Sequence, residues 1–528
     1  RHILVDEFQD TNVLQYRWLK LLAGLGTEHQ AAVMAVGDDD QSIYRFRGAE
    51  VGNMRDFERE FHVDNVIRLE QNYRSHGNIL DAANAVIRHN SGRLGKNLWT
   101  EAGSGEPLRV YEAFNDIEEA RWVVEEIKAL IHDGTARDDI ALLYRSNAQS
   151  RVLEHALFSA GIPYRVYGGL RFFERQEVKH ALAYMRLIAN PHDDTAFTRV
   201  VNFPTRGIGA RSLEQLQDAA QAHSTSLYGA LNFLTGKAAQ SVGAFIKLVD
   251  QLRFACEGLK LPEMVEQVLE LSGLRAHYLT EKEGQERVAN LDEIINAAAN
   301  FISEEGYAQV AAEDETAPPD LLSAFLSHAS LEAGEHQADA GQAAVQLMTV
   351  HSAKGLEFDV VFMGGLEEGL FPHENSVLER DGLEEERRLM YVAITRARHR
   401  LYLSFAQSRM LHGQTRYNLR SRFFDEIPAE LMKWLTPPAS ARGYGGFGGS
   451  SVPSAPPSSN PRSFGSGRKN PAVNDSGFRI GQQVAHAKFG AGVIVNAEGS
   501  GSDARVQVNF GAHGVKWLAL AVAKLTPA

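Results

Sequence analysis

Residues 3–10 read ILVDEFQD, a short apolar run that ends in two adjacent carboxylates. A continuous apolar run bounded by polar residues is typical of a buried parallel strand. Residues 31–36, AAVMAV, form a second such run, and GDDDQ follows them. The amphipathic stretch between the two runs predicts a helix, capped by Thr11 or Asn12 and ending near Gly24. Strand, helix and strand in this order indicate an α/β fold.

The same alternation continues to about residue 437. The apolar residues expected to face the core on the first helix are Leu14, Trp18, Leu21 and Leu22. Further strands are expected at 140–144, 345–350, 359–363 and 401–405, and further helices after Ser75 and around 120–131. Between about 166 and 340 the strand signal nearly vanishes, and the segment is rich in Ala, Leu and Gln. The pattern therefore predicts an α/β lobe interrupted by a helical insertion.

The last ninety residues differ in composition from the rest. Residues 437–477 are rich in Gly, Ser and Pro, a composition that cannot bury enough apolar surface to order itself, so we expect a disordered linker. Residues 478–528 contain short strand-like runs separated by turn residues, which favours a small β-barrel. Its expected core residues are Phe478, Phe489, Phe510 and Trp517.

Composition and charge exclude several classes of protein. The chain has 528 residues, of which 44% are hydrophobic and 23% charged, so several globular domains are expected. Its single cysteine, Cys256, excludes an internal disulfide and a Cys-rich zinc site. No apolar stretch is long enough for a membrane span, so a cytoplasmic protein without a membrane partner is expected. The net charge of −13 argues against a protein that coats nucleic acid by bulk charge, although a local basic groove remains compatible with it.

Polar clusters follow the predicted strands at the places where ligands bind in open α/β sheets. Asp6 and Glu7 end one strand, Gln41 follows the next, and His351 and Lys354 follow a third. Paired carboxylates after an apolar strand suit nucleotide chemistry, in which one holds Mg²⁺ and the other orients an attacking water. The adjacent Asp38, Asp39 and Asp40 also fit a solvated turn, which we expect for Asp39.

Five longer motifs occur in a fixed order: VDEFQDTN, VGDDDQSIYRFRGAE, LEQNYRSHGNIL, TVHSAKGLEFDVVF and EEERRLMYVAITRAR. Together they closely resemble the motifs of superfamily 1 DNA helicases of the UvrD/Rep/PcrA family, over about residues 1–430. The resemblance implies two RecA-like P-loop NTPase lobes and a Tudor-like C-terminal barrel. The implied division is a first lobe at 1–66, a second lobe at 67–165 and 341–436, a helical insertion at 166–340, the linker at 437–477 and the barrel at 478–528.

The resemblance also implies an ATP site with Mg²⁺. Asp6 would coordinate the metal, Glu7 would be the general base, and Gln41 would sense the γ-phosphate. The other implied ATP-binding residues are Tyr73, which would stack on adenine, Arg74, which would touch the γ-phosphate, Gly355, Glu357, which would contact the ribose, and Arg396, a second arginine finger.

Arg396 has independent support from helical spacing. On a helix expected from Glu384 to Arg398, Leu389, Val392 and Arg396 share one stripe. An arginine on a buried stripe needs an anionic partner, and a phosphate would supply one. Alternatively, its guanidinium could bind the helix's own C-terminal carbonyls or a core carboxylate.

Candidate DNA-binding residues come from three segments. In Tyr44, Arg45, Phe46 and Arg47, aromatic side chains that stack on bases alternate with cations that contact phosphates. Packing on its own lobe is the alternative, and it suits Tyr44 better than Phe46. By resemblance, Thr349, His351 and Lys354 would touch the DNA backbone. A glycine turn that includes Arg206, Gly207 and Gly209 would grip duplex phosphates, although an ordinary helix–helix turn explains it nearly as well.

The predicted function is therefore an ATP-dependent 3′→5′ DNA helicase of repair and replication, acting on single-stranded DNA and the duplex fork. The resemblance further implies nucleoid association, mismatch and excision repair partners, and RNA polymerase binding through 478–528. The sequence contains no phosphate-binding Gly-Lys-Ser or Gly-Lys-Thr loop. We therefore expect a fragment whose beginning has been cut away: the parent protein would be an ATP-driven motor, and the chain as given would hydrolyse ATP poorly or not at all. The alternatives are a non-catalytic DNA-binding scaffold and a helicase–nuclease fusion, and the latter has no candidate nuclease segment.

Overall fold

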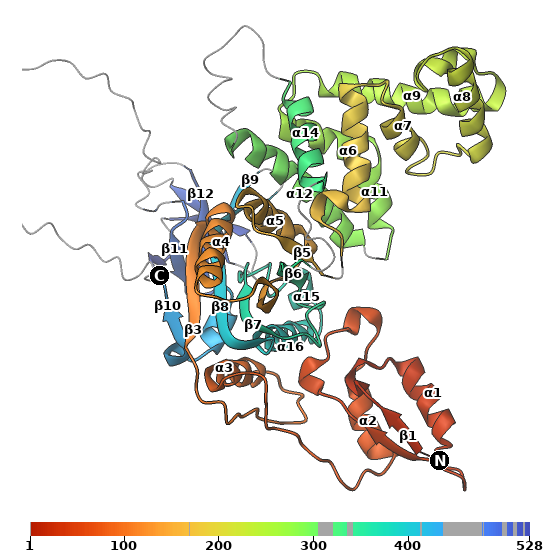
Figure 1. Cartoon of the computed structure of the whole chain (residues 1–528). Coiled ribbons are helices and arrows are strands. Elements are labelled where there is room, and N and C mark those ends of the chain that lie inside the picture. The colour runs from red at the N-terminus through yellow and green to blue at the C-terminus, as the bar shows by residue number, and fades with distance from the viewer. Residues whose placement is uncertain are drawn as a thin grey trace, which may run out of the picture.

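The computed structural model describes residues 2–167, 169–282, 284–304, 320–334, 342–411, 414–436, 478, 480–498, 504–510, 515–520 and 523–527. Three sheets and a group of helices organise these residues (Figure 1). We call the part that carries the first two strands the first lobe, and the part that carries the large central sheet the second lobe. The expected linker at 437–477 lies outside the described residues.

The first lobe is built on two parallel strands, β1 (His2–Val5) and β2 (Ala32–Ala35). Helix α1 (Val13–Ala23) connects them, and α2 (Gly52–Glu60) follows. The Asn12 side chain accepts from the Gln15 backbone N–H while the Gln15 side chain accepts from that of Asn12, a capping box that fixes where α1 begins. Gly24 ends the helix in the left-handed conformation. The predicted strand–helix–strand order is confirmed.

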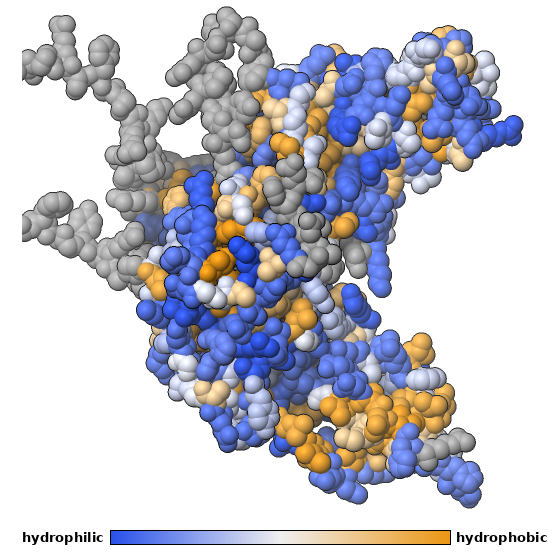
Figure 2. All heavy atoms as spheres, in the orientation of Figure 1, coloured by the Kyte–Doolittle hydropathy of each residue, from blue (hydrophilic) through white to orange (hydrophobic). Residues whose placement is uncertain are grey.

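The buried face of α1 is not the predicted one. The structure buries Tyr16, Leu19 and Ala23, whereas the expected core residues are all exposed: Leu14, Trp18, Leu21 and Leu22. Figure 2 shows hydrophobic side chains gathered on the surface of this lobe. The helix carries apolar residues on two sides, and periodicity alone did not decide which side packs on the sheet.

The second lobe is a mainly parallel sheet with strand order β10-β3-β8-β7-β4-β6-β5, and β9 pairs antiparallel with β8. Its strands are β3 (Leu108–Asn115), β4 (Ile140–Tyr144), β5 (Tyr164–Val166), β6 (Val345–Thr349), β7 (Phe358–Met363), β8 (Ala397–Leu411), β9 (Gln414–Tyr417) and β10 (Met432–Trp434). The strands predicted in this lobe are confirmed, and β8 is longer than expected.

Helices cover the two faces of this sheet with separate cores. One core contains residues of α3 (Gly77–Ile87) and α16 (Gly382–Ile394). The other contains residues of α4 (Asp116–His132) and α5 (Ser150–Ser159). Two short helices, α15 (Glu374–Leu378) and α17 (Phe423–Glu426), complete the lobe. A parallel sheet covered on both faces is the α/β class expected from the sequence.

The helical insertion lies between β5 and β6 in the chain and projects from the sheet (Figure 1). Its helices are α6 (Gln176–Ala189), α7 (Asp194–Val200), α8 (Ala210–Ala222), α9 (Gly236–Cys256), α10 (Leu261–Leu271), α11 (Leu274–Leu279), α12 (Gly284–Glu304) and α14 (Leu321–Gly334). They share one apolar core, in which Cys256 is buried and unpaired. None of the described helices combines the length and the apolar composition that crossing a bilayer demands.

The C-terminal segment forms a five-stranded antiparallel sheet of order β14-β13-β12-β11-β15. Its strands are β11 (Gln483–His486), β12 (Gly490–Glu498), β13 (Arg505–Asn509), β14 (Val515–Ala519) and β15 (Leu525–Pro527). Phe510 is in the core, and Phe478 and Phe489 pack against it, as predicted. Trp517 is 41% exposed, so its prediction as a core residue is wrong. It lies under the guanidinium of Arg505 instead, 5.0 Å from the ring centroid.

Candidate functional site

Asp6 and Glu7 lie in the turn that follows β1. Both are exposed, and Glu7 adopts a left-handed backbone conformation with φ of 47°. Non-glycine residues in this conformation carry strain that the surrounding structure must hold. The turn is fixed by the Phe8 backbone N–H, which donates to the carbonyl of Val36, and by Gln9 Nε2, which donates to Glu7 Oε2 at 2.6 Å. Two carboxylates are thereby presented to solvent at the end of a strand.

Gln41 follows β2 at the equivalent edge of the two-stranded sheet. Its Nε2 donates to Asp38 Oδ2 at 2.6 Å, which orients the amide. Asp39 is only 7% exposed and accepts from the backbone N–H of Leu94, so the prediction that it lies in a solvated turn is wrong. The sequence gives no signal for this contact, because Leu94 is distant in the chain.

Arg396 lies just beyond the end of α16. The helix stops at Ile394 and β8 begins at Ala397, so the prediction of one helix to Arg398 is wrong. Arg396 is only 1% exposed. Its guanidinium donates to the carbonyls of Val392 (3.0 Å) and Leu356 (2.9 Å) and to Oγ1 of Thr395 (3.1 Å), all neutral acceptors. In this structure the guanidinium of Arg396 therefore binds carbonyl groups, one of them at the end of α16, as the alternative prediction has it.

The charge of Arg396 is not neutralised by any ion pair among the described residues. Burial and the nearby charge of Arg74 together lower the pKa of its guanidinium to about 10, while Glu357 acts in the opposite direction. Arg74 Nη1 lies 3.4 Å from the carbonyl of Thr395, so the two arginines are neighbours. A buried cation beside a second cation is costly unless an anion joins them, and a phosphate group fits this requirement.

Glu357 is the carboxylate that holds the outer arginines. Arg74 Nε contacts its Oε2, and Arg398 contacts its Oε1. Hydrogen bonds from Arg398 and Arg74 lower the pKa of Glu357 to about 2 against the effect of burial. Both carboxylate oxygens of Glu357 are therefore engaged within the protein.

The two remaining nucleotide candidates are exposed. Gly355 has a backbone φ of 85°, and Tyr73 is 85% exposed, which leaves both faces of its ring accessible.

Lys354 joins the two lobes. The sequence analysis predicts that Lys354 touches DNA, but its side chain is only 8% exposed. Its Nζ lies 3.2 Å from Glu7 Oε2 and 2.6 Å from Asp10 Oδ2. It also donates to the carbonyl of Gln41 at 3.1 Å. One ammonium group from the second lobe thus contacts both strand-end turns of the first lobe, and it is not available to a phosphate of DNA in this structure.

An aromatic cluster of Tyr44, Phe46 and His351 lies next to this junction. Phe46 is 58% exposed and contacts the His351 ring edge-on, with centroids 5.4 Å apart. Tyr44 is half-buried, and its hydroxyl donates to the carbonyl of His351 at 3.3 Å, which agrees with a packing role. Arg47 lies 5.3 Å from the centroids of both Tyr44 and Phe46. Burial lowers the pKa of His351 to about 3, so its imidazole is neutral.

Two other predicted DNA residues flank this cluster. The Arg45 backbone N–H and guanidinium donate to Glu385 and to the carbonyl of Arg380 in the second lobe. Thr349 ends β6, and its Oγ1 shares a hydrogen bond with Ser352 at 3.0 Å. The structure therefore brings together candidate DNA-binding residues from segments about three hundred residues apart.

The glycine turn of the insertion lies apart from these residues. Gly207 and Gly209 are exposed, and α8 begins directly after Gly209. Arg206, in contrast, donates to the carbonyls of Val200 (3.2 Å), Pro204 (3.0 Å) and Ser272 (2.9 Å). Its guanidinium is used inside the insertion, so the prediction of a phosphate contact from Arg206 is not supported by this structure. Arg211, in the first turn of α8, is exposed.

One contact at the lobe junction has no counterpart among the predictions. Arg93 donates to both oxygens of Asp40 at 2.7 Å, and Asp40 is buried. Such bidentate pairs fix geometry strongly. The pair links the turn after β2 to the segment that follows α3, and no motif spacing could have indicated it.

Comparisons with known proteins agree with the motifs. Residues 1–62 match the UvrD/REP helicase N-terminal domain, residues 67–408 the UvrD-like helicase C-terminal domain, and residues 480–527 the PcrA/UvrD tudor domain. The chain is 50% identical over 533 residues to DNA helicase II of Escherichia coli K12, covering 99% of this chain and 70% of that protein. It is 41% identical over 540 residues to the ATP-dependent DNA helicase PcrA of Bacillus subtilis 168, again covering 99% of this chain and 70% of the relative.

Proposed function

This chain belongs to the UvrD-like helicase family, and from that premise we propose that it acts in an ATP-dependent DNA helicase that moves 3′→5′ on single strands in repair and replication. The observation that carries the proposal is the placement of Arg396. Its buried, uncompensated guanidinium lies beside Arg74, near the junction where Lys354 reaches Glu7. A triphosphate at this junction would supply the missing negative charge.

The nucleotide roles follow from what each side chain presents. Asp6 would hold Mg²⁺, which neutralises phosphate charge when it is bound. Glu7, exposed and on a constrained turn, would accept the proton of the attacking water. Gln41, oriented by Asp38, would sense the γ-phosphate. Arg74 and Arg396 would stabilise the charge of the transferred phosphoryl group.

The base and sugar would bind further out. The open ring of Tyr73 offers a stacking surface for adenine. Glu357 would contact the ribose beside Gly355 only if Arg74 exchanges this carboxylate for the phosphate. That exchange couples nucleotide binding to a change in the Arg74 side chain.

Single-stranded DNA would follow the aromatic cluster. Phe46 offers an exposed stacking face, Arg47 places its charge over the rings, and Thr349 lies at a strand end nearby. The ammonium of Lys354 connects the aromatic cluster to Glu7, so DNA binding at the cluster would change the surroundings of the proposed general base. The exposed glycines Gly207 and Gly209 would meet the duplex ahead of the fork.

The partners beyond DNA belong to the same proposal. The segment that matches the PcrA/UvrD tudor domain would contact RNA polymerase, and mismatch and excision repair proteins would direct the motor to damage on the nucleoid. A pull-down with the C-terminal sheet intact and with Trp517→Ala tests the polymerase contact. If the unaltered chain does not capture RNA polymerase, the proposed contact is ruled out.

Strand displacement tests the helicase function directly. The protein, expressed from its complete reading frame, is mixed with ATP, Mg²⁺ and duplexes that carry either a 3′ or a 5′ single-stranded tail. Unwinding of the 3′-tailed duplex alone is expected. DNA binding without ATP-dependent unwinding would instead support the non-catalytic scaffold, and unwinding from the 5′ tail would contradict the direction of movement.

A further inference from the structure

Two histidines and a glutamate meet where the second lobe joins the helical insertion. His155 is on α5, and His328 and Glu332 are on α14. Glu332 Oε1 lies 2.5 Å from His155 Nδ1 and 3.0 Å from His328 Nε2. One ligand atom from each of the three side chains lies within 4.8 Å of the others. The cluster lies on other elements than Arg396, which follows α16, and takes no part in the proposed nucleotide site.

We propose that His155, His328 and Glu332 bind a divalent transition-metal ion, with zinc as the best fit, and so tie the helical insertion to the second lobe. Imidazole nitrogens with one carboxylate oxygen are a ligand set that zinc takes in proteins. His328 and Glu332 are four residues apart on one helix, a spacing that places both on the same face.

The geometry requires only a small adjustment. At metal–ligand distances of about 2.0–2.1 Å, tetrahedral ligand atoms lie roughly 3.3 Å apart. The two contacts to Glu332 would therefore open by less than about 1 Å from their hydrogen-bonded lengths. The ligand atoms of His155 and His328 lie within 4.8 Å of each other and would close by up to about 1.5 Å.

The carboxylate already faces both imidazoles. The same oxygen, Glu332 Oε1, lies within hydrogen-bonding distance of His155 Nδ1 and His328 Nε2. A metal ion would take the place of the protons shared in these contacts.

The backbone around Glu332 is already held in place. Arg171 donates to the carbonyls of Glu332 (3.3 Å) and Ala333 (2.5 Å), which fixes the last turn of α14. The nearby cations have acidic partners of their own: Arg171 pairs with Glu174 at 3.1 Å, and Arg151 pairs with Glu293 at 2.5 Å. A metal ion would thus join a supported site and not a cluster of unpaired positive charges.

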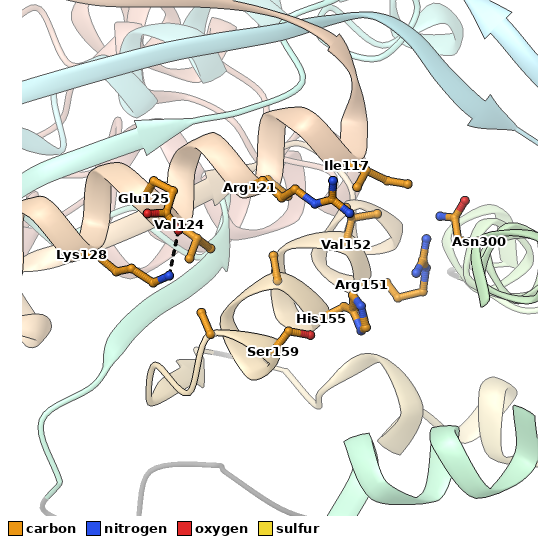
Figure 3. A pocket seen from close by; sticks show the side chains of 13 residues that line it. Ile117, Arg121, Val124, Glu125, Lys128, Arg151, Val152, His155, Ser159 and Asn300 are labelled. Atoms are coloured by element: carbon orange, nitrogen blue, oxygen red, sulfur yellow. Dashed lines mark hydrogen bonds and ion pairs between the residues drawn. The ribbon is translucent and has the colours of Figure 1, made fainter. Parts of the chain in front are cut away.

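Space for a fourth ligand is present beside the three side chains. A cavity of about 20 Å³, lined by the three ligands and Asn300 among others, is large enough for one water. A larger cavity of about 470 Å³ shares His155, Arg151 and Asn300 with it. In Figure 3, His155 and Arg151 of α5 line this larger cavity, and Asn300 of α12 lies beside Arg151.

The test is a competition titration of Zn²⁺ between the purified chain and a chromophoric chelator. We expect one tight equivalent per chain, weakened at least about tenfold in His328→Gln and in Glu332→Gln. The matched control is His132→Gln, an exposed histidine on α4 that should leave the affinity unchanged. Equal affinity in all three variants, or no stoichiometric binding, would overturn the site in favour of a metal-free His–Glu–His hydrogen-bonded triad.

A second measurement covers the case in which a variant does not fold. Co²⁺ added to the unaltered chain should give the intense visible absorption of a tetrahedral nitrogen and oxygen environment. A weak octahedral spectrum would contradict the proposal. Neither readout depends on ATP hydrolysis, so the site stands or falls separately from the helicase function.

Discussion

Lys354 Nζ lies 3.2 Å from Glu7 Oε2 and 2.6 Å from Asp10 Oδ2, so an ammonium from the second lobe compensates two carboxylates of the first. Burial raises the pKa of Asp10, and Lys354 acts against that rise. Through this contact, Glu7, the proposed general base, lies next to the loop after β6 that carries Lys354. The contact therefore joins the two lobes through charged groups next to the proposed site.

Replacing Lys354 with Met should destabilise the junction by roughly 1–3 kcal/mol, because it leaves the half-buried Asp10 without its charged donor. The measurement is the urea midpoint of the first unfolding transition. The control is Lys128→Met, whose exposed pair with Glu125 should change stability by no more than about 0.5 kcal/mol. Equal effects of the two substitutions would contradict the structural role of Lys354.

Replacing Glu7 with Gln should abolish turnover while leaving ATP binding intact, because the amide keeps the shape of the side chain but cannot accept the proton of water. A loss of about 10²–10⁴ in the rate of hydrolysis is expected. The assay uses the protein from its complete reading frame, with Glu58→Gln, an exposed acid on α2, as control. Hydrolysis retained in the Glu7 variant would remove it as the base.

Replacing Phe46 with Ala should weaken binding of single-stranded DNA, because the exposed ring is the stacking surface nearest to His351 and Arg47. A loss of about 1–3 kcal/mol per stacked base is expected in fluorescence anisotropy with an oligothymidine. Phe254→Ala removes a ring on α9 that is even more exposed than that of Phe46, and it should have no effect. If both variants bind like the parent, Phe46 serves only to pack.

The Glu357 pair predicts a specific dependence on pH. Its pKa falls from an ordinary 4.5 to about 2 in the folded protein, so the pair stabilises the fold above about pH 4.5 and loses this effect as the pH falls toward 2. The difference in Tm between the parent and Glu357→Gln should therefore shrink over that range. A constant difference from pH 6 to pH 3 would contradict the ion pairing with Arg74 and Arg398.

The parts of the fold that local patterns determine were predictable. The strand of residues 140–144 is buried at every position, and Asn12 and Gly24 delimit α1, because apolar runs and caps are local signals. The choice between the two apolar sides of α1 was not predictable. It depends on packing against other elements, and Trp18 faces solvent.

The candidate site divides in the same way. Motif order brought Glu7, Gln41, Arg74 and Arg396 into one hypothesis, and the structure gives Arg396 a burial that periodicity had indicated. The helical period was extended too far, because α16 ends at Ile394, before Arg396, and a strand begins at Ala397. Partners distant in the chain left no local signal: Lys354 binds acids, and Arg206 binds carbonyls.

The most direct test of a triphosphate held between the two lobes is DNA-stimulated ATP hydrolysis by Arg396→Ala, compared with the parent expressed from its complete reading frame. Thermal melting of both proteins establishes that the variant is folded. An arginine finger predicts a fall in kcat of about 10³ to 10⁵. A fall of less than about tenfold in a folded variant would contradict the account.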